Sequence, residues 1–232
     1  KVLRAKMPAA AQPDLLGYLD LVALATVCDV VPLTGVNGPF VVKGLLAIRR
    51  LQNVGLAALT RVSRIGEPVA TFHLSFLLGP RINAGGRIGD AALGARLLMT
   101  KNPDEARDIA AKLDHLNRER QAVEEAMLAE AEEEALALAG LDDAGRSVLV
   151  VAGERWHPGI VGIVAGRIKE RFQRPAFAIA HGEGEFASGS GRSLAGVDLG
   201  AAVRAAVDAG ILIKGGGHAM AAGVTLLPER IA

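Results

Sequence analysis

The sequence predicts an α/β protein: a mostly helical first part is joined by one long helix to a small α/β domain with a mixed sheet. Residues 103–139 contain no glycine and, after Pro103, no proline, and Ala, Glu, Leu and Arg dominate them. The apolar clusters before this stretch follow helical patterns that Gly and Pro interrupt. After it, short apolar runs alternate with helical stretches, and 16 of the 28 glycines lie beyond residue 141. Alternating strands and helices indicate a small α/β domain.

Start and stop signals bound the long helix. Asn102 suits the N-cap, Pro103 suits the first helical position, and Glu105 stands three residues after the cap, where it completes a capping box. Gly140 then ends the helix. Apolar side chains at helical spacing predict one buried stripe, formed by Ile109, Leu113, Leu116, Val123 and Met127.

The second half of this helix is acidic. Glu130 to Glu134 is too rich in carboxylates to be buried, so we expect it to lie in solvent. The length of the helix favours a connector between two domains, and an ordinary helical hairpin arm is the alternative. The predicted parts are residues 1–102, 103–140 and 141–232, and the last has strands near 147–152 and 175–180 and helices near 158–172 and 198–209.

The composition is that of a globular protein, with 50% apolar and 22% charged residues among 232. No uninterrupted apolar run approaches the ~20 residues of a membrane span. The single cysteine, Cys28, cannot form an internal disulfide, and no secretory signal pattern opens the chain, so we expect a cytoplasmic protein. The start at Lys1, without an initiator methionine, is what we expect of a fragment.

Positive charge gathers at the front of the chain, although the net charge is only +1. Residues 1–100 carry 11 Lys or Arg against 5 Asp or Glu, residues 101–141 carry 5 against 11, and residues 142–232 carry 10 against 9. A basic excess can attract phosphate groups, and a solvated basic surface is the alternative.

Asp29 lies within an apolar run from Leu21 to Leu33 that we expect to be largely buried. A buried carboxylate must accept hydrogen bonds, pair with a cation or bind a metal ion, because its desolvation is otherwise uncompensated. Asp29 is therefore a candidate metal ligand, and a capping role or a structural ion pair is the alternative. Cys28 beside it is expected to be a small buried apolar side chain.

Arg81, Asn83 and Arg87 lie among four glycines within residues 79–90. Glycines let backbone N–H groups approach a phosphate, and guanidinium groups bind its oxygens in pairs, so this segment is a candidate anion loop. It lacks the Gly-Lys-Ser/Thr ending of a Walker loop. A tight turn with two exposed arginines is the alternative.

Two glycine-rich segments are the strongest local signals of the second domain. Residues 188–193 contain Ser190 and Arg192, and residues 214–223 contain three consecutive glycines followed by His218. Because consecutive glycines cost conformational entropy, we expect both segments to approach an anion through their backbone. The alternative for His218 is a hydrogen bond within the protein.

A third glycine pattern opens the helix expected to start at Pro158. Gly159, Gly162 and Gly166 fall on one face, and we expect them to allow close packing against another backbone. His157, just before the helix, is a weaker ligand candidate.

In this order, the segments resemble the RecJ branch of the DHH phosphoesterase superfamily. Residues 20–33 resemble the fourth metal motif of that family, and residues 81–87 resemble its core arginine motif. Residues 157–167, 190–193 and 215–223 are similar to the signature of the accessory DHHA1 domain. The resemblance covers nearly the whole chain, and coincidence would rarely place five motifs in the expected order.

The resemblance implies hydrolysis of single-stranded DNA from a phosphorylated 5′ end by two Mn²⁺ or Mg²⁺ ions, in DNA repair and recombination. It implies that Asp29 is a metal ligand and thereby a catalytic residue. It assigns to the DNA Arg81, Asn83 and Arg87 near the cut, Ser190 and Arg192 at the terminal 5′ phosphate, and Gly216, Gly217 and His218 in the nucleotide groove.

The 232 residues lack the Asp-His-Asp and Asp-His-His motifs of the family and its oligonucleotide-binding domain. We therefore expect a fragment that holds one metal ligand and has no nuclease activity of its own. One alternative is a relative in the superfamily that cleaves short oligonucleotides or cyclic dinucleotides, which would act only on very short substrates. The other is a non-catalytic nucleic-acid-binding protein, which intact upstream motifs would exclude.

Overall fold

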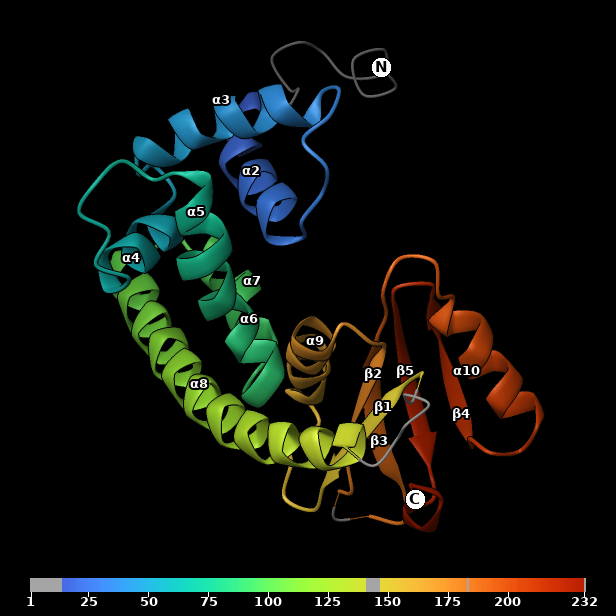
Figure 1. Cartoon of the computed structure of the whole chain (residues 1–232). Helices are drawn as coiled ribbons and strands as arrows, with labels where there is room; N and C mark the ends of the chain where they lie inside the picture. Colours follow the sequence, from blue (N-terminus) through green and yellow to red (C-terminus); the bar gives the residue numbers. More distant parts are fainter. Residues whose placement is uncertain (1–13, 141–146, 183, 232) are drawn as a thin grey trace. The chain divides into compact units, whose positions relative to one another are not determined.

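The computed structural model describes residues 14–140, 147–182 and 184–231 (Figure 1). The chain divides into two compact units, Lys1–Asn117 and Arg118–Ala232. The long helix α8, Pro103–Gly140, contributes residues to both units. None of the described helices combines the length and the apolar character needed to cross a membrane.

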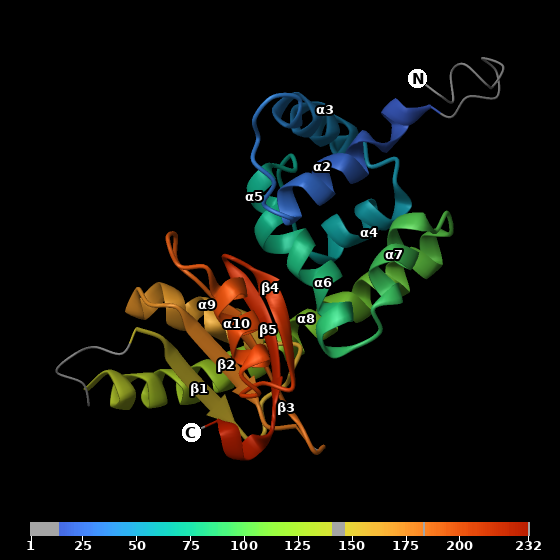
Figure 2. The same cartoon turned by 90° about the vertical axis from the view of Figure 1, so that its right-hand side faces the viewer.

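The first unit is helical, which confirms the expectation for the front of the chain (Figure 2). Its core consists of buried leucines and other aliphatic side chains between Ala23 and Leu116. Before α8, its described elements are η2 (Leu15–Tyr18), α2 (Leu19–Cys28), α3 (Asn37–Arg49), α4 (Val54–Val62), α5 (Thr71–His73), the π-helix η3 (Leu74–Leu78), α6 (Gly79–Ile88) and α7 (Ala92–Met99).

Helix α8 begins with the expected cap but without the expected capping box. Asn102 Oδ1 accepts a hydrogen bond from the N–H of Asp104 at 2.9 Å. The Glu105 carboxylate instead accepts hydrogen bonds from Arg96 and Thr100, and these bonds lower the pKa of Glu105. The N–H of Asn102 donates to Thr100 Oγ1 at 3.1 Å, so Thr100 takes the place of the Glu105 side chain.

The apolar stripe of α8 is buried at Ile109, Leu113, Leu116 and Met127, whereas Val123 is 36% exposed. The expectation that the acidic second half lies in solvent holds for Glu130 and Glu133, which are exposed, but not for the opposite face of the helix. Ala131 and Ala135 are fully buried in the second unit. The carboxylates between and beside them are satisfied by donors: Glu130 Oε2 accepts from Trp156 Nε1 at 2.8 Å, and Glu134 Oε2 accepts from the Ala152 N–H at 2.9 Å.

In the second unit, the described strands form one mixed sheet in the order β1-β2-β3-β5-β4, which confirms the predicted fold class. β1 and β2 are parallel, and the other neighbours are antiparallel. Figure 1 shows α9 on one side of this sheet and α10 on the other. The bounds are β1 Leu149–Gly153, α9 Val161–Phe172, β2 Ala176–Ala180, β3 Ala187–Arg192, α10 Leu199–Asp208, β4 Lys214–His218, β5 Ala221–Leu226 and η4 Pro228–Arg230.

The predicted strands and helices of this unit are present, with shifted ends. Helix α9 starts at Val161 and not at Pro158, because residues 157–160 form a turn in which the Ile160 N–H donates to the His157 carbonyl. The two glycine-rich segments, residues 188–193 and 214–223, lie almost entirely in strands β3, β4 and β5. Glycine is needed there for packing: a Cβ at Gly191 would lie 2.5 Å from the Phe177 ring.

Candidate nucleic-acid interface

The sheet register brings four residues singled out in the sequence onto one face. Arg192 of β3 and His218 of β4 are both paired with Ala221 of β5. Two residues further along each strand, Ser190 of β3 and Gly216 of β4 are likewise both paired with Gly223 of β5. Directly paired residues of an antiparallel sheet point to the same side, so these side-chain positions form two adjacent rows on one face.

Arg192 is a half-buried cation on this face. Its Nη1 donates to Ser190 Oγ at 2.7 Å and to the Gly191 carbonyl at 2.9 Å, which holds the guanidinium along the strand. Burial lowers the pKa of the Arg192 guanidinium below its ordinary value. Among the described residues, no carboxylate forms a salt bridge with Arg192. A fixed, partly desolvated cation without a protein carboxylate favours an anionic ligand.

The first turn of α9 lies against this cation. A Cβ at Gly162 would lie 2.8 Å from Arg192 Nη2 and 3.2 Å from Ser190 Oγ. The N-terminus of a helix carries unpaired N–H groups and a partial positive charge, which favour phosphate. Ser190, Arg192 and the start of α9 therefore supply a hydroxyl, a guanidinium and a helix N-terminus at one place.

The glycine pattern of α9 acts differently from our expectation. Gly162 makes room for the side chains of Ser190 and Arg192 and does not pack against another backbone. A Cβ at Gly166 would meet nothing within 4 Å. His157 Nδ1 accepts a hydrogen bond from the Gly159 N–H at 3.0 Å, which helps to shape the turn before the helix.

The β4 end of the face is open. A Cβ at Gly216 would meet no atom within 4 Å. His218 is exposed, and its Nδ1 accepts a hydrogen bond from the Met220 N–H at 3.3 Å. Gly217 belongs to the opposite face: its Cβ would lie 2.2 Å from the Ala221 carbonyl oxygen. Glycine at 217 thus serves the packing of the sheet, while Gly216 leaves a bare surface.

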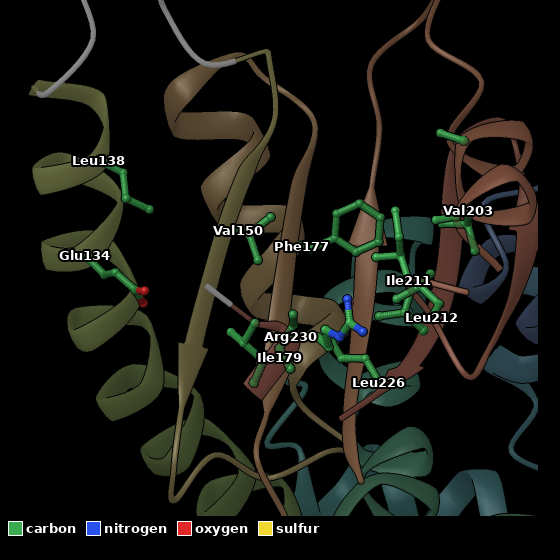
Figure 3. Close-up of a pocket in the computed structure, with 14 residues that line it drawn as sticks. Glu134, Leu138, Val150, Phe177, Ile179, Val203, Ile211, Leu212, Leu226 and Arg230 are labelled. Atoms are coloured by element: carbon green, nitrogen blue, oxygen red, sulfur yellow. The ribbon is translucent and has the colours of Figure 1, made fainter. Parts of the chain in front are cut away.

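An apolar groove of about 500 Å³ lies on the other face of the same sheet. Figure 3 shows Phe177, Ile179 and Leu226 around it, with Arg230 among them. Phe177 and Ile179 alternate along β2 with the residues that pair with Ser190 and Arg192, so the groove faces away from those two side chains. The groove is therefore separate from the candidate interface.

In the first unit, the expectation that Asp29 is buried is wrong. Within the run, Ala23, Leu24 and Val27 are buried, whereas Asp29 and Val30 are exposed, and Val30 is 86% exposed. The helix ends here: Asp29 is the C-cap of α2, and the Val31 N–H donates to the Thr26 carbonyl at 3.0 Å. Val30 adopts φ 54°, a left-handed conformation that is unfavourable for a β-branched residue.

Asp29 nevertheless shares a cavity with another predicted site residue, Asn83. The cavity has a volume of about 620 Å³ and is also lined by Cys28. The thiol of Cys28 donates to the Leu74 carbonyl at 3.4 Å. Burial, with a smaller effect from the charge of Asp29, raises the pKa of Cys28 to about 11. Cys28 is therefore a protonated packing residue at neutral pH.

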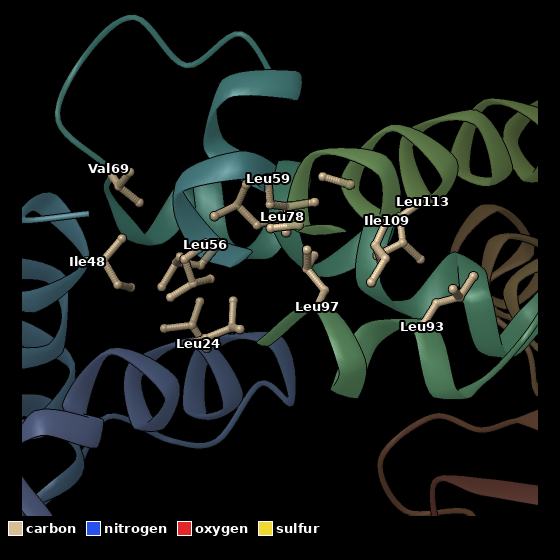
Figure 4. Packing of buried hydrophobic residues seen from close by; sticks show 14 of the residues in the cluster. Leu24, Ile48, Leu56, Leu59, Val69, Leu78, Leu93, Leu97, Ile109 and Leu113 are labelled. Atoms are coloured by element: carbon tan, nitrogen blue, oxygen red, sulfur yellow. The ribbon is translucent and has the colours of Figure 1, made fainter. Parts of the chain in front are cut away.

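The candidate anion loop around Arg81 is the helix α6, so its backbone N–H groups are used within the helix. Figure 4 shows Leu78, Leu97 and Leu113 packed in the core beside it. The glycines permit close contacts: a Cβ at Gly79 would lie 2.6 Å from Cys28 Sγ. The sequence pattern reflects tight helix packing.

Arg81 is engaged inside the first unit. Its Nε donates to Asp114 Oδ1 at 2.9 Å and its Nη1 to the Leu77 carbonyl at 2.8 Å. The two charged side chains are only 15% and 12% exposed. Asn83 is exposed and is therefore better placed than Arg81 for a ligand, whereas Arg87 is half-buried.

A metal site is not complete within the described part of the chain. No three His, Cys, Asp or Glu side chains gather there around a point that could hold an ion. Asp29, with the amide of Asn83 in the same cavity, supplies one carboxylate. Two hard cations need several oxygen ligands, so these residues alone do not fit a two-ion centre.

Comparison with known proteins identifies the class first. Residues 145–232 match the DHHA1 domain family, and this range contains the whole face that carries Arg192 and His218. The second unit is thus a DHHA1 domain preceded by the end of α8.

The wider comparison identifies the family. The chain is 42% identical over 224 residues to the single-stranded-DNA-specific exonucleases RecJ of Dickeya dadantii and Escherichia coli, which covers 95% of this chain and 39% of each relative. It matches the crystal structure of RecJ in complex with Mg²⁺ from Thermus thermophilus with a TM-score of 0.80 and 36% identity, over 96% of this chain and 35% of that one. The chain belongs to the RecJ family and spans about two fifths of the length of the Dickeya and Escherichia relatives.

Proposed function

We propose that this chain is part of an exonuclease that hydrolyses single-stranded DNA from the 5′ end, and that its DHHA1 domain holds the terminal 5′ phosphate. The arrangement of Arg192 carries the proposal: the guanidinium is half-buried, fixed on Ser190 and adjacent to the start of α9. The RecJ relatives of Dickeya dadantii and Escherichia coli are single-stranded-DNA-specific exonucleases, which supports single-stranded DNA as the substrate.

The open row toward β4 gives the strand a path. Gly216 leaves the surface bare, and His218 stands exposed at the end of the Arg192 row. A strand whose 5′ phosphate is bound at Arg192 would cross β5 and meet His218 about 10 Å away, two strand spacings along the sheet. Its imidazole would donate to a phosphate oxygen or stack on a base.

The first unit would supply one metal ligand, Asp29, with Asn83 and Arg87 as contacts to the DNA. Structures of Thermus RecJ were determined with Mg²⁺ and with Mn²⁺, which supports one of these ions as the cofactor. When bound, such ions would stabilise the attacking and leaving oxygens of phosphodiester hydrolysis. Because the described residues supply too few ligands, the 232 residues should be inactive by themselves.

This assignment gives each segment a role. Residues 1–102 would be the C-terminal part of the DHH catalytic core, residues 103–140 the connecting helix, and residues 141–232 the DHHA1 substrate-binding domain. The setting would be the cytoplasm, in DNA repair and recombination.

The chain can be tested by binding labelled single strands that differ only in a 5′ phosphate or a 5′ hydroxyl. We expect roughly ten- to a hundredfold tighter binding of the phosphorylated strand at one fixed salt concentration, since a charge-assisted bond is worth about 1.5–3 kcal/mol. Equal affinities would contradict the assignment of the 5′ phosphate. Degradation of the strand by this chain in Mn²⁺, abolished by EDTA, would contradict its inactivity.

The role of Asp29 is tested in an exonuclease that contains this segment. Asp29 is exposed, so Asp29→Ala leaves the packing intact. We expect turnover to fall far more than DNA affinity, and equal losses in both would argue for a structural role.

A further inference from the structure

Two phenyl rings stand exposed and side by side on the first unit. Phe72 is 58% exposed and Phe76 is 65% exposed. Their ring centroids are 5.0 Å apart with an interplanar angle of 34°. Among the 232 residues only six are phenylalanine, so two exposed rings in contact are a notable local concentration of aromatic surface.

The helix beneath holds the rings in place. Leu74 and Leu78 lie on the same helical segment as the two rings but point into the core, where they are fully buried. His73 is also buried, and its Nδ1 accepts a hydrogen bond from the Ala70 N–H at 2.9 Å, which fixes the start of the helix. The exposed rings therefore project from a firmly packed base.

The backbone between the rings is unusual. Residues Leu74–Leu78 form the π-helix η3, which joins α5 to α6 without a break. A π-helical turn inserts an extra residue into a helix and is found often at functional sites. Here it lies at the two rings, next to the part of the helix that reaches the cavity of Asp29.

The same helix continues to the candidate site. Asn83 lies seven residues after Phe76, which is about 10 Å along the helix axis at ~1.5 Å per residue. Asn83 is exposed and lines the cavity that contains Asp29. An aromatic pair and a polar site thus follow one another along one continuous helix.

We propose that Phe72 and Phe76 form a stacking platform for the bases of the single strand. Single-stranded nucleic acids are bound by aromatic side chains that stack on bases and by positive charge that attracts the backbone. Residues 1–100 carry 11 Lys or Arg against 5 Asp or Glu, so a polyanion is favoured over an apolar protein segment as the occupant. The inference rests on the proposed function for its substrate, and it adds contacts to the bases.

The test compares a thymidine oligonucleotide with an abasic strand of the same length, which keeps every phosphate. We expect the 232-residue chain to bind the thymidine strand more tightly. Phe72→Ala and Phe76→Ala should each weaken that binding about five- to tenfold or more, while binding to the abasic strand and the salt dependence stay unchanged. Phe40→Ala, which removes a 43% exposed ring from α3, is the matched control and should change neither affinity.

Conservative variants separate stacking from simple apolar contact. Phe76→Tyr keeps the aromatic face and should retain binding, whereas Phe76→Leu keeps apolar surface only and should bind like Phe76→Ala. Full retention by Phe76→Leu, or equal losses on the thymidine and abasic strands, would overturn the platform. Because both rings are exposed, unfolding curves of the variants should match that of the parent chain.

The outcomes also separate this inference from the proposed function. If the chain does not distinguish a 5′ phosphate from a 5′ hydroxyl but depends on both rings, the role of Arg192 is wrong and the platform stands. If the phosphate is distinguished and the rings have no effect, the platform is wrong and the role of Arg192 stands. A chain that binds no single strand would overturn both.

Discussion

Arg192 and His218 lie in one row across the sheet of the second unit, because each is paired with Ala221 from opposite sides of β5. They are 26 residues apart in the chain and two strands apart in space. The residue between them is an alanine, so no large side chain rises between the guanidinium and the imidazole. Arg192 and His218 therefore lie on one surface, which the first two predictions test.

Arg192→Ala should weaken the binding of a 5′-phosphorylated single strand by roughly ten- to a hundredfold, because it removes a charge-assisted bond worth about 1.5–3 kcal/mol. A strand with a 5′ hydroxyl should lose much less. Fluorescence anisotropy at one salt concentration measures both affinities. The same loss on both strands would make Arg192 a general backbone contact or a folding residue.

Gly162→Ala should reproduce part of that loss, because the added Cβ would lie 2.8 Å from Arg192 Nη2 and displace the guanidinium. The displaced atom is the end of a flexible side chain, so the fold should survive. Gly166→Ala is the matched control, since its Cβ meets nothing within 4 Å and alanine favours a helix by about 0.5–1 kcal/mol over glycine. Binding that falls equally in both variants would exclude a specific contact with Arg192.

Arg81→Met should destabilise the first unit by up to roughly 3–5 kcal/mol, because it leaves a largely buried Asp114 without its guanidinium partner. Urea unfolding measures this change. Arg107→Met removes the exposed pair with Asp104 and should cost less than about 1 kcal/mol. Should Arg81→Met lower DNA affinity without lowering stability, Arg81 would be a phosphate contact as the motif implied.

The thiol of Cys28 should react slowly with iodoacetamide at pH 8, because a pKa of about 11 leaves very little thiolate. The protonated thiol contributes fully to the free energy of unfolding below pH 9, which is the ordinary pKa of a thiol. This contribution is lost as the pH rises from 9 to 11. Alkylation followed by mass spectrometry, with and without urea, measures the protection. Fast reaction of the folded chain at pH 8 would show that Cys28 is accessible and ionised.

Much of the architecture could be predicted from the sequence, because helix caps, proline positions and apolar spacing act locally. The long helix at Pro103–Gly140 and the strands around Val151 and Ala178 are examples. The strands that contain Gly191 and Gly216 were missed, because glycine disfavours a strand unless a neighbour needs its space. That neighbour, such as the ring of Phe177, is visible only in the folded chain.

The candidate site was predictable in residue type more than in geometry. Ser190, Arg192 and His218 were singled out, but only the register shows that they share a face. Gly162 was singled out for packing against a backbone, whereas it is the neighbour of Arg192. The Asp29 segment was expected to be buried because it is apolar, but the exposed Val30 in a left-handed conformation ends the helix there.

The contacts of α8 with the sheet determine where a shortened form of the protein should begin. β1 is the last strand on its side of the sheet, and Glu134 accepts a hydrogen bond from its Ala152 N–H. Glu130 likewise holds the indole of Trp156. A shortened product that begins at residue 145, where the DHHA1 match begins, would leave this strand edge unprotected and free to pair with other molecules. A product that begins near Arg118 would keep the edge covered, and would therefore be the better choice for expression as a soluble monomer.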